Sequence, residues 1–190
     1  MTPPAVKICG IGLAETAEIA FEAGADYLGL VFAPSPRQVN PEQAKEIVRA
    51  VPGRYIGVFR NMTDLDYAAQ VAETVGIFGI QCHGCSPAGW VAWAKTRGLM
   101  AVATDLRVAD ADVWLLDGPR SGSGISWEWE LPNDHRPYWI AGGLRPDNVR
   151  QVVERLSPAG VDVSSGVETD GQKDPIRIVR FIKEAKAWPR

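Results

Sequence analysis

A thiol and a lysine stand close together near the start of the chain, where an apolar segment over residues 6–9 ends at Gly10. In an extended strand, side chains two positions apart share a face, so Lys7 and Cys9 point the same way. A neighbouring ammonium group lowers the pKa of a thiol from about 8.5, which favours a thiolate that acts as a base or a nucleophile. An inert buried cysteine is the alternative interpretation of Cys9.

A carboxyl group ends another apolar segment further along the chain. Asp117 follows Leu115 and Leu116, and partial burial there would raise its pKa and keep it protonated, as a general acid must be. A thiolate and a protonated carboxyl group on two sides of one cavity form an acid–base pair. Cys9 and Asp117 are therefore candidate catalytic residues.

Three turns rich in glycine and serine indicate a phosphate site. Backbone N–H groups at loops and helix starts hold phosphate, and glycine lets the backbone approach it closely. Each turn alone could also be no more than a tight turn. The residues expected to bind the substrate in these turns are Gly122, Gly124, Gly142, Gly143, Ser164, Ser165 and Gly166.

Two further motifs have a chemical and a plain structural interpretation. Arg37, after Ser35 and Pro36, carries the planar fork of donors that grips a carboxylate, or it is a solvated loop arginine. Residues 82–85 have the CxxC spacing of a metal or redox site, but only His135 and Cys9 remain to complete a tetrahedral set. Cys82 and His83 would also point to opposite faces of a strand. We expect no metal site and no redox role there.

Short apolar segments carry these residues at their ends and alternate with amphipathic segments. The expected strands are 6–9, 27–32, 55–59, 79–83, 99–103, 113–117, 138–141 and 161–164. Alternating strands and helices with short turns predict right-handed βαβ units and a parallel sheet. Eight units predict an α/β protein with a closed (β/α)8 TIM barrel, whose active site lies at the C-terminal ends of the strands. An open, doubly wound sheet is the alternative.

The segments between the strands show helix start and stop signals. The first helix is expected over 13–23 and the last over 175–187. Asn40 and Pro41 open the second helix, Thr63 is expected to cap the third, and the fourth is expected to begin at Ser86. Only residues 104–112 join the fifth and sixth strands, so we expect the fifth helix to be short or absent and one flank of the barrel to be exposed.

Length and composition exclude several classes of protein. A chain of 190 residues predicts one domain, residues 1–190. Its 20 Lys and Arg against 23 Asp and Glu give a formal net charge of −3, which argues against a nucleic-acid partner. No apolar run has the length of a signal peptide or a membrane helix, so no membrane partner is expected. Three cysteines cannot all pair with one another, and we expect reduced thiols in a cytoplasmic protein.

In series, these motifs resemble the phosphoribosylanthranilate isomerase family of tryptophan biosynthesis. The resemblance covers essentially the whole chain, through segments 7–11, 24–37, 57–59, 81–84, 115–124, 141–149 and 161–168. The sequence departs from the family at Cys82, where a leucine is usual, and at Ile125, where a lysine is frequent. Trp127 and Trp129 lie where a Phe-Asp-Trp segment is typical.

The resemblance implies an acid–base Amadori rearrangement of N-(5-phosphoribosyl)anthranilate to 1-(2-carboxyphenylamino)-1-deoxy-D-ribulose 5-phosphate, the third step from chorismate to tryptophan. It implies that Cys9 is the general base, that Asp117 is the general acid and that Arg37 holds the anthranilate carboxylate. His83 would line the cavity or hydrogen-bond behind it. The resemblance implies no cofactor and no metal, a small phosphosugar substrate, and a monomer or a homodimer. Another phosphosugar barrel enzyme, or a barrel that binds a phosphorylated ligand without turnover, is the alternative.

Overall fold

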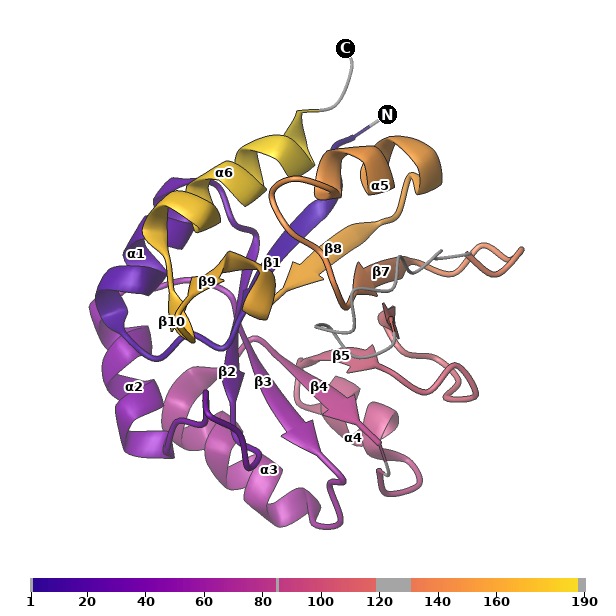
Figure 1. The fold of residues 1–190 in the computed structure, drawn as a ribbon. Helices are drawn as coiled ribbons and strands as arrows, with labels where there is room; N and C mark the ends of the chain where they lie inside the picture. Colours follow the sequence, from indigo (N-terminus) through magenta and orange to yellow (C-terminus); the bar gives the residue numbers. More distant parts are fainter. Residues whose placement is uncertain (1, 85, 119–130, 188–190) are drawn as a thin grey trace.

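Eight parallel strands of the computed structural model close into a barrel in chain order (Figure 1). The structure describes residues 2–84, 86–118 and 131–187. The strands are β1 (Ala5–Cys9), β2 (Tyr27–Val31), β3 (Tyr55–Arg60), β4 (Gly79–His83), β5 (Met100–Ala103), β6 (Val113–Asp117), β7 (Tyr138–Ala141) and β8 (Gly160–Val163). Each lies within one residue of its predicted bounds. Because β8 pairs with β1, the alternative of an open sheet is wrong.

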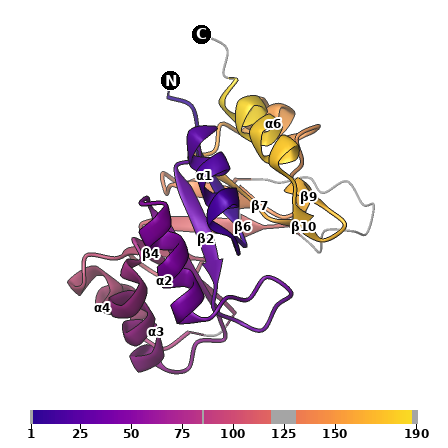
Figure 2. The ribbon, with the colours of Figure 1, turned by 90° about the vertical axis from the view of Figure 1, so that its left-hand side faces the viewer.

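Helices cover much of the outside of the barrel. They are α1 (Ala14–Glu22), α2 (Pro41–Ala50), α3 (Leu65–Val71), which a π-helical turn η1 (Ala72–Gly76) continues, α4 (Trp90–Thr96), α5 (Val149–Leu156) and α6 (Pro175–Lys186). The series α1 to α4 wraps around one side, and α6 packs between α1 and α5 (Figures 1 and 2).

The helix starts follow local hydrogen bonding. As predicted, the side chain of Asn40 caps α2 by accepting from the N–H of Gln43 at 2.8 Å. The prediction of Thr63 as the cap of α3 is wrong, because Asp64 accepts from the N–H of Asp66 instead. The prediction that α4 begins at Ser86 is also wrong. Gly89 has a left-handed φ of +76°, which no right-handed helix can pass through, so α4 begins at Trp90.

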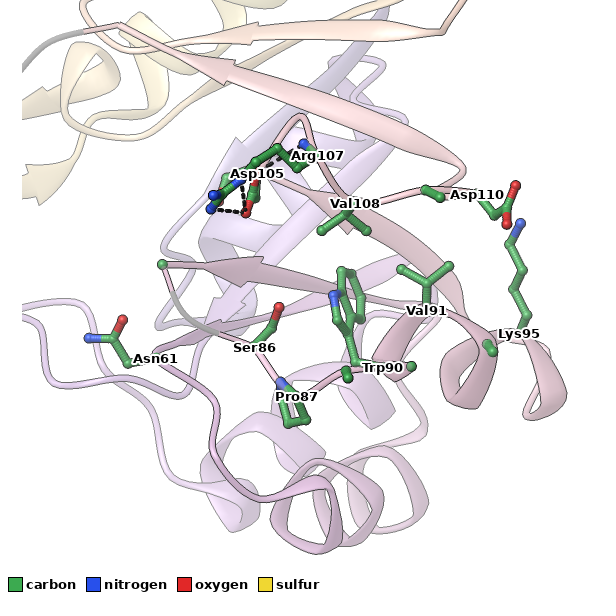
Figure 3. Close-up of a pocket in the computed structure, with 16 residues that line it drawn as sticks. Asn61, Ser86, Pro87, Trp90, Val91, Lys95, Asp105, Arg107, Val108 and Asp110 are labelled. Carbon is green, nitrogen blue, oxygen red and sulfur yellow. Dashed lines mark hydrogen bonds and ion pairs between the residues drawn. The ribbon is translucent and has the colours of Figure 1, made fainter.

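The connection between β5 and β6 confirms the expectation of a missing fifth helix. Residues 104–112, all of which the structure describes, contain no helix. A hollow of about 1070 Å³, here called the flank groove, lies between this connection and α4 (Figure 3). Trp90 and Val91 of α4 and Val108 of the connection line it.

Two apolar layers lie on opposite sides of the barrel wall. Alternate strand residues such as Ile8, Leu30 and Ile80 face outward and pack in the large cluster beneath the helices. The intervening positions face inward, and a second cluster of them consists of Ile56, Val102, Val113, Leu115, Trp139 and Ala141. This period of two fills the interior of the barrel with apolar side chains and places the inward polar side chains of several strands, such as Cys9, His83 and Asp117, at their C-terminal ends.

Candidate active site

A cavity of about 310 Å³ opens at the C-terminal ends of the strands, and we call it the barrel-mouth cavity. The described residues that the sequence predicted for the site all line it, namely Cys9, Arg37, His83, Asp117, Gly142, Gly143, Ser164, Ser165 and Gly166. Gly122 and Gly124, and with them Ile125, Trp127 and Trp129, lie outside the described residues. Cys85 of the CxxC motif does as well.

A buried ion pair lies beneath the thiol. Lys7 is fully buried, and its Nζ donates to both carboxylate oxygens of Asp162 at 3.1 Å. The two residues are register partners on the adjacent strands β1 and β8. Cys9 follows on the same inward face of β1, and Ser164 donates from its hydroxyl to the Cys9 carbonyl oxygen at 3.1 Å.

The protonation of Cys9 differs from the sequence-based expectation. Burial raises the pKa of the Cys9 thiol above its usual range and outweighs the opposing effect of the Lys7 ammonium. The predicted lowering of the thiol pKa is therefore wrong. The sequence placed the lysine correctly but did not reveal that Asp162 pairs with it and adds a negative charge beside the sulfur.

Asp117 ends β6 on the opposite side of the cavity. Burial, followed by the nearby carboxylate of Asp162, raises the pKa of Asp117, while Arg60 and Lys7 act in the opposite sense. This direction agrees with the interpretation of Asp117 as a proton donor. A Cβ atom added to Gly142 would lie 2.7 Å from Oδ1 of Asp117, so the carboxyl group is packed directly against the glycine turn after β7.

The glycine and serine turns after β7 and β8 lie against each other. A Cβ atom on Gly166 would come within 1.8 Å of the carbonyl oxygen of Leu144, so only glycine allows the two backbones to approach this closely. Gly142 and Gly143 both have left-handed φ values, +79° and +70°. Such turns expose backbone N–H groups, which suits an anion at this edge of the cavity.

Arg37 is held by a hairpin that the sequence analysis missed. The hairpin consists of β9 (Glu168–Thr169) and β10 (Gln172–Lys173). Glu168 accepts from Nε and Nη2 of Arg37, each at 2.6 Å, and it also pairs with Lys173. The arginine is therefore not the solvated loop residue of the plain interpretation.

His83 ends β4 with its ring in the cavity. A hydrogen bond of 2.6 Å joins its Nε2 to Nε2 of Gln81, two residues earlier on the same face. Burial, assisted by the charge of Lys7, lowers the pKa of His83 to about 4, so the ring is neutral near pH 7. Cys82 points outward into the apolar core, as the strand period predicts.

Sequence reasoning missed several cavity residues that belong to the same inward faces, namely Arg60, Gln81 and Asp162. A signal for Asp162 existed, because a carboxylate between Val161 and Val163 in a buried strand needs a partner. Lys7 posed the same question in β1. Lys7 and Asp162 could have been paired from the sequence, because the first and last strands of a closed barrel are neighbours.

The described residues form neither a metal cluster nor a membrane-spanning helix. Within residues 2–84, 86–118 and 131–187, no three His, Cys, Asp or Glu side chains gather as a metal site would require. No helix in that part of the chain is long and apolar enough to cross a membrane.

Comparison with known proteins decides the family. The family model of N-(5'-phosphoribosyl)anthranilate isomerase matches residues 6–184. The chain belongs to this family. An N-(5'-phosphoribosyl)anthranilate isomerase of Streptococcus pneumoniae (strain Taiwan19F-14) is 40% identical over 190 residues, which cover 95% of each protein.

Solved structures of family members share the barrel. The dimeric phosphoribosylanthranilate isomerase of Thermotoga maritima, crystallised as monomers, superposes with a TM-score of 0.81 at 34% identity over 97% of this chain and 100% of that one. A second isomerase, in complex with reduced 1-(o-carboxyphenylamino)-1-deoxyribulose 5-phosphate, gives a TM-score of 0.85 at 33% identity with the same coverage. An isomerase of Thermus thermophilus gives a TM-score of 0.80 at 32% identity, covering 95% of this chain and 97% of that one.

Proposed function

We propose that this enzyme converts N-(5-phosphoribosyl)anthranilate to its deoxyribulose isomer in the barrel-mouth cavity, with Cys9 as the base and Asp117 as the acid. One observation carries the assignment of roles. A single cavity brings together a thiol on β1, a carboxyl group of raised pKa on β6 and the glycine turns after β7 and β8. A metal is not required for any step below.

The reaction begins with a proton from Asp117 to the furanose ring oxygen. The bond between that oxygen and C1′ breaks, and the nitrogen lone pair forms the C=N bond of a Schiff base. Cys9, as a thiolate, then takes the proton from C2′. The electrons of that C–H bond form the C1′=C2′ bond of an enolamine, and the nitrogen regains its lone pair. The enolamine tautomerises to the ketone. Each positioned proton transfer supplies about 10²–10⁴-fold in rate.

The remaining cavity residues hold the two ends of the substrate. The turns at Gly142, Gly143 and 164–166 suit the phosphate, because they combine left-handed glycines with backbones in close contact. Arg37 is proposed to hold the anthranilate carboxylate, and His83 to line the ring side as a neutral imidazole. Fixing both ends orients C2′ toward Cys9 and the ring oxygen toward Asp117.

The test follows the loss of anthranilate-adduct fluorescence when the protein meets phosphoribosylanthranilate made in situ by anthranilate phosphoribosyltransferase. The wild type is expected to turn over, and Cys9→Ala and Asp117→Asn are each expected to lose about 10²-fold or more. Cys82→Ala, which removes the outward-facing buried thiol, is the matched control and is expected to retain activity.

Full turnover by Cys9→Ala or Asp117→Asn would contradict the assigned role. A wild type without turnover, but stabilised against heat by the product, would instead indicate a barrel that binds the phosphorylated ligand and does not react with it.

Two properties outside the site belong to the same proposal. We infer a cytoplasmic enzyme, which agrees with the free thiols of Cys9 and Cys82. We also infer a monomer or a homodimer, and sedimentation velocity at several concentrations distinguishes the two. Larger assemblies would contradict this inference.

A further inference from the structure

The burial of the Lys7–Asp162 ion pair inside the barrel is unfavourable in desolvation free energy. Moving two charges out of water carries a large desolvation cost, and apolar residues often replace such pairs without loss of stability. Lys7 is fully buried, and the side chain of Asp162 is 7% exposed. The proposed mechanism gives neither residue a direct contact with the substrate. Their position beside the thiol suggests another reason for their presence.

Gly29 shows how closely the pair approaches the sulfur. A Cβ atom added to this glycine of β2 would lie 2.8 Å from Sγ of Cys9 and 3.1 Å from Nζ of Lys7. The thiol and the ammonium group therefore face the same small space, which only a residue without a side chain leaves open. The Lys7 ammonium interacts with Cys9 as well as with Asp162.

We propose that Lys7 and Asp162 are positioning residues that control the protonation of Cys9. The ammonium group favours the thiolate, and Asp162 holds that ammonium against the sulfur. This proposal rests on the role of Cys9 as the base. Lys7 keeps its proton throughout, and Cys9 alone exchanges one with the substrate.

The two charges act on the thiol in opposite directions. The positive charge of Lys7 lowers the pKa of Cys9, and the negative charge of Asp162 raises it. Lys173 of β10 also lowers it, and the Arg37 guanidinium faces the same thiol. Glu168 pairs with both of these outer cations. Lys7 is the cation on the same strand as Cys9, and removing it exposes the sulfur to the uncompensated Asp162.

The experiment measures the rate of Cys9 alkylation by iodoacetamide against pH, with the modified cysteine identified by peptide mass spectrometry. Lys7→Met is expected to raise the apparent pKa of the Cys9 thiol by about one unit or more, a tenfold loss of thiolate below that pKa. Asp162→Asn is expected to lower it. Gln81→Leu, which removes an uncharged inward-facing amide from β4, is the control and is expected to leave it unchanged.

Opposite shifts in the two variants are the signature of a charge effect. Equal shifts in both, or none in either, would overturn the proposal, because a purely structural pair affects the thiol alike when either member is lost. Should a single variant fail to fold, Lys7→Met/Asp162→Asn removes both charges together. Its Cys9 thiol is expected to have an apparent pKa below that of Lys7→Met or above that of Asp162→Asn, whichever single variant folds. This apparent pKa is also expected to lie above that of Gln81→Leu. A value equal to that of Gln81→Leu would overturn the proposal.

Turnover separates this proposal from the one on which it rests. Lys7→Met is expected to lower kcat at pH 7 about tenfold with little change in KM, and to recover part of the loss as the pH rises. If Cys9→Ala retains activity, Cys9 is not the base, but the alkylation shifts still report whether the pair governs its protonation.

Discussion

The barrel-mouth cavity and the flank groove are both hollows of the same barrel, and they differ in what lines them. The groove is the larger, about 1070 Å³ against about 310 Å³. It lies between α4 and a connection without a helix, so its walls are a helix flank and turns (Figure 3). The cavity is formed by the last inward-facing residues of strands from around the barrel.

Charged groups behave differently in the two hollows. Arg107 of the flank groove is largely exposed and the side chain of Asp105 is 35% exposed. The hydrogen bonds from Arg107 lower the pKa of Asp105 to about 2. In the barrel-mouth cavity burial dominates, so the pKa of Asp117 rises and that of His83 falls. Judged by volume alone, the flank groove would be chosen as the active site. Enclosure and the convergence of titratable groups from several strands select the cavity.

The largest difference between the two hollows is expected when a methyl group is added to one glycine in each. Gly142→Ala places a Cβ atom 2.6 Å from the Gly118 nitrogen and 2.7 Å from Oδ1 of Asp117, so it displaces the proposed acid. We expect kcat/KM to fall about 10²-fold or more. Gly89→Ala has a similar left-handed φ of +76° but open space around its Cβ. It is expected to cost about 1–2 kcal/mol of stability and no activity. Steady-state kinetics and thermal unfolding of both variants test this, and equal losses of activity would contradict it.

Removing one arginine from each hollow gives a smaller effect. Arg37→Met is expected to lower kcat/KM about 10–100-fold, mainly through KM, because a charged hydrogen bond contributes about 1.5–3 kcal/mol. Arg107→Met breaks only the solvated pair with Asp105 and is expected to leave both constants unchanged. Unchanged KM in Arg37→Met would remove this residue from the proposed carboxylate site.

The pH dependence of folding stability is expected to reveal the buried, neutral His83 of the barrel-mouth cavity. The pKa of His83 is about 4 in the folded protein, against about 6.5 in an unfolded chain. The unfolded state therefore binds more protons between these values, so the stability that neutral His83 contributes is present above pH 6.5 and is lost as the pH falls toward 4. His83→Asn is expected to flatten this decline by up to about 2.4 kcal/mol in urea unfolding measured from pH 7 to pH 4.5. The same slope in the variant would show that His83 is not its cause.

The smallest effect is expected beside the groove, at an exposed leucine of the same connection. Leu106 is 38% exposed on the connection between β5 and β6, and Leu106→Ser is expected to change stability by no more than about 0.5 kcal/mol. Turnover is expected to stay the same. A large loss that depends on protein concentration would contradict this expectation, since it would mean that another molecule covers Leu106.

The barrel could be predicted from the sequence because its strands are short apolar segments with polar residues at one end. The missing helix followed from the length of the connection alone. The helix starts were harder, since Thr63 and Asp64 are both good caps and only the backbone geometry chooses between them. The predicted start of α4 at Ser86 was wrong for the same reason, because the left-handed backbone of Gly89 delays the helix to Trp90.

The site was predicted where it depends on a residue's own strand and missed where it depends on pairing across the sheet. Cys9, His83 and Asp117 could be placed because each ends an apolar segment. Asp162 and Glu168 act through partners 155 and 131 residues away, Lys7 and Arg37. The prediction of a lowered thiol pKa was wrong for this reason, because the burial of Cys9 and the second charge beside it arise only in the closed barrel.

The seam between β1 and β8 also bears on how the chain reaches its folded state. Lys7 and Asp162 meet only when the last strand docks on the first. A partial barrel that lacks β8 leaves an ammonium group among apolar side chains without a counter-charge. Intermediates that bury the interior before closure are thus disfavoured, and the first and last strands are coupled into one cooperative unit of high contact order. The same contact that would tune the thiol is expected to make closure of the ring close to all-or-none.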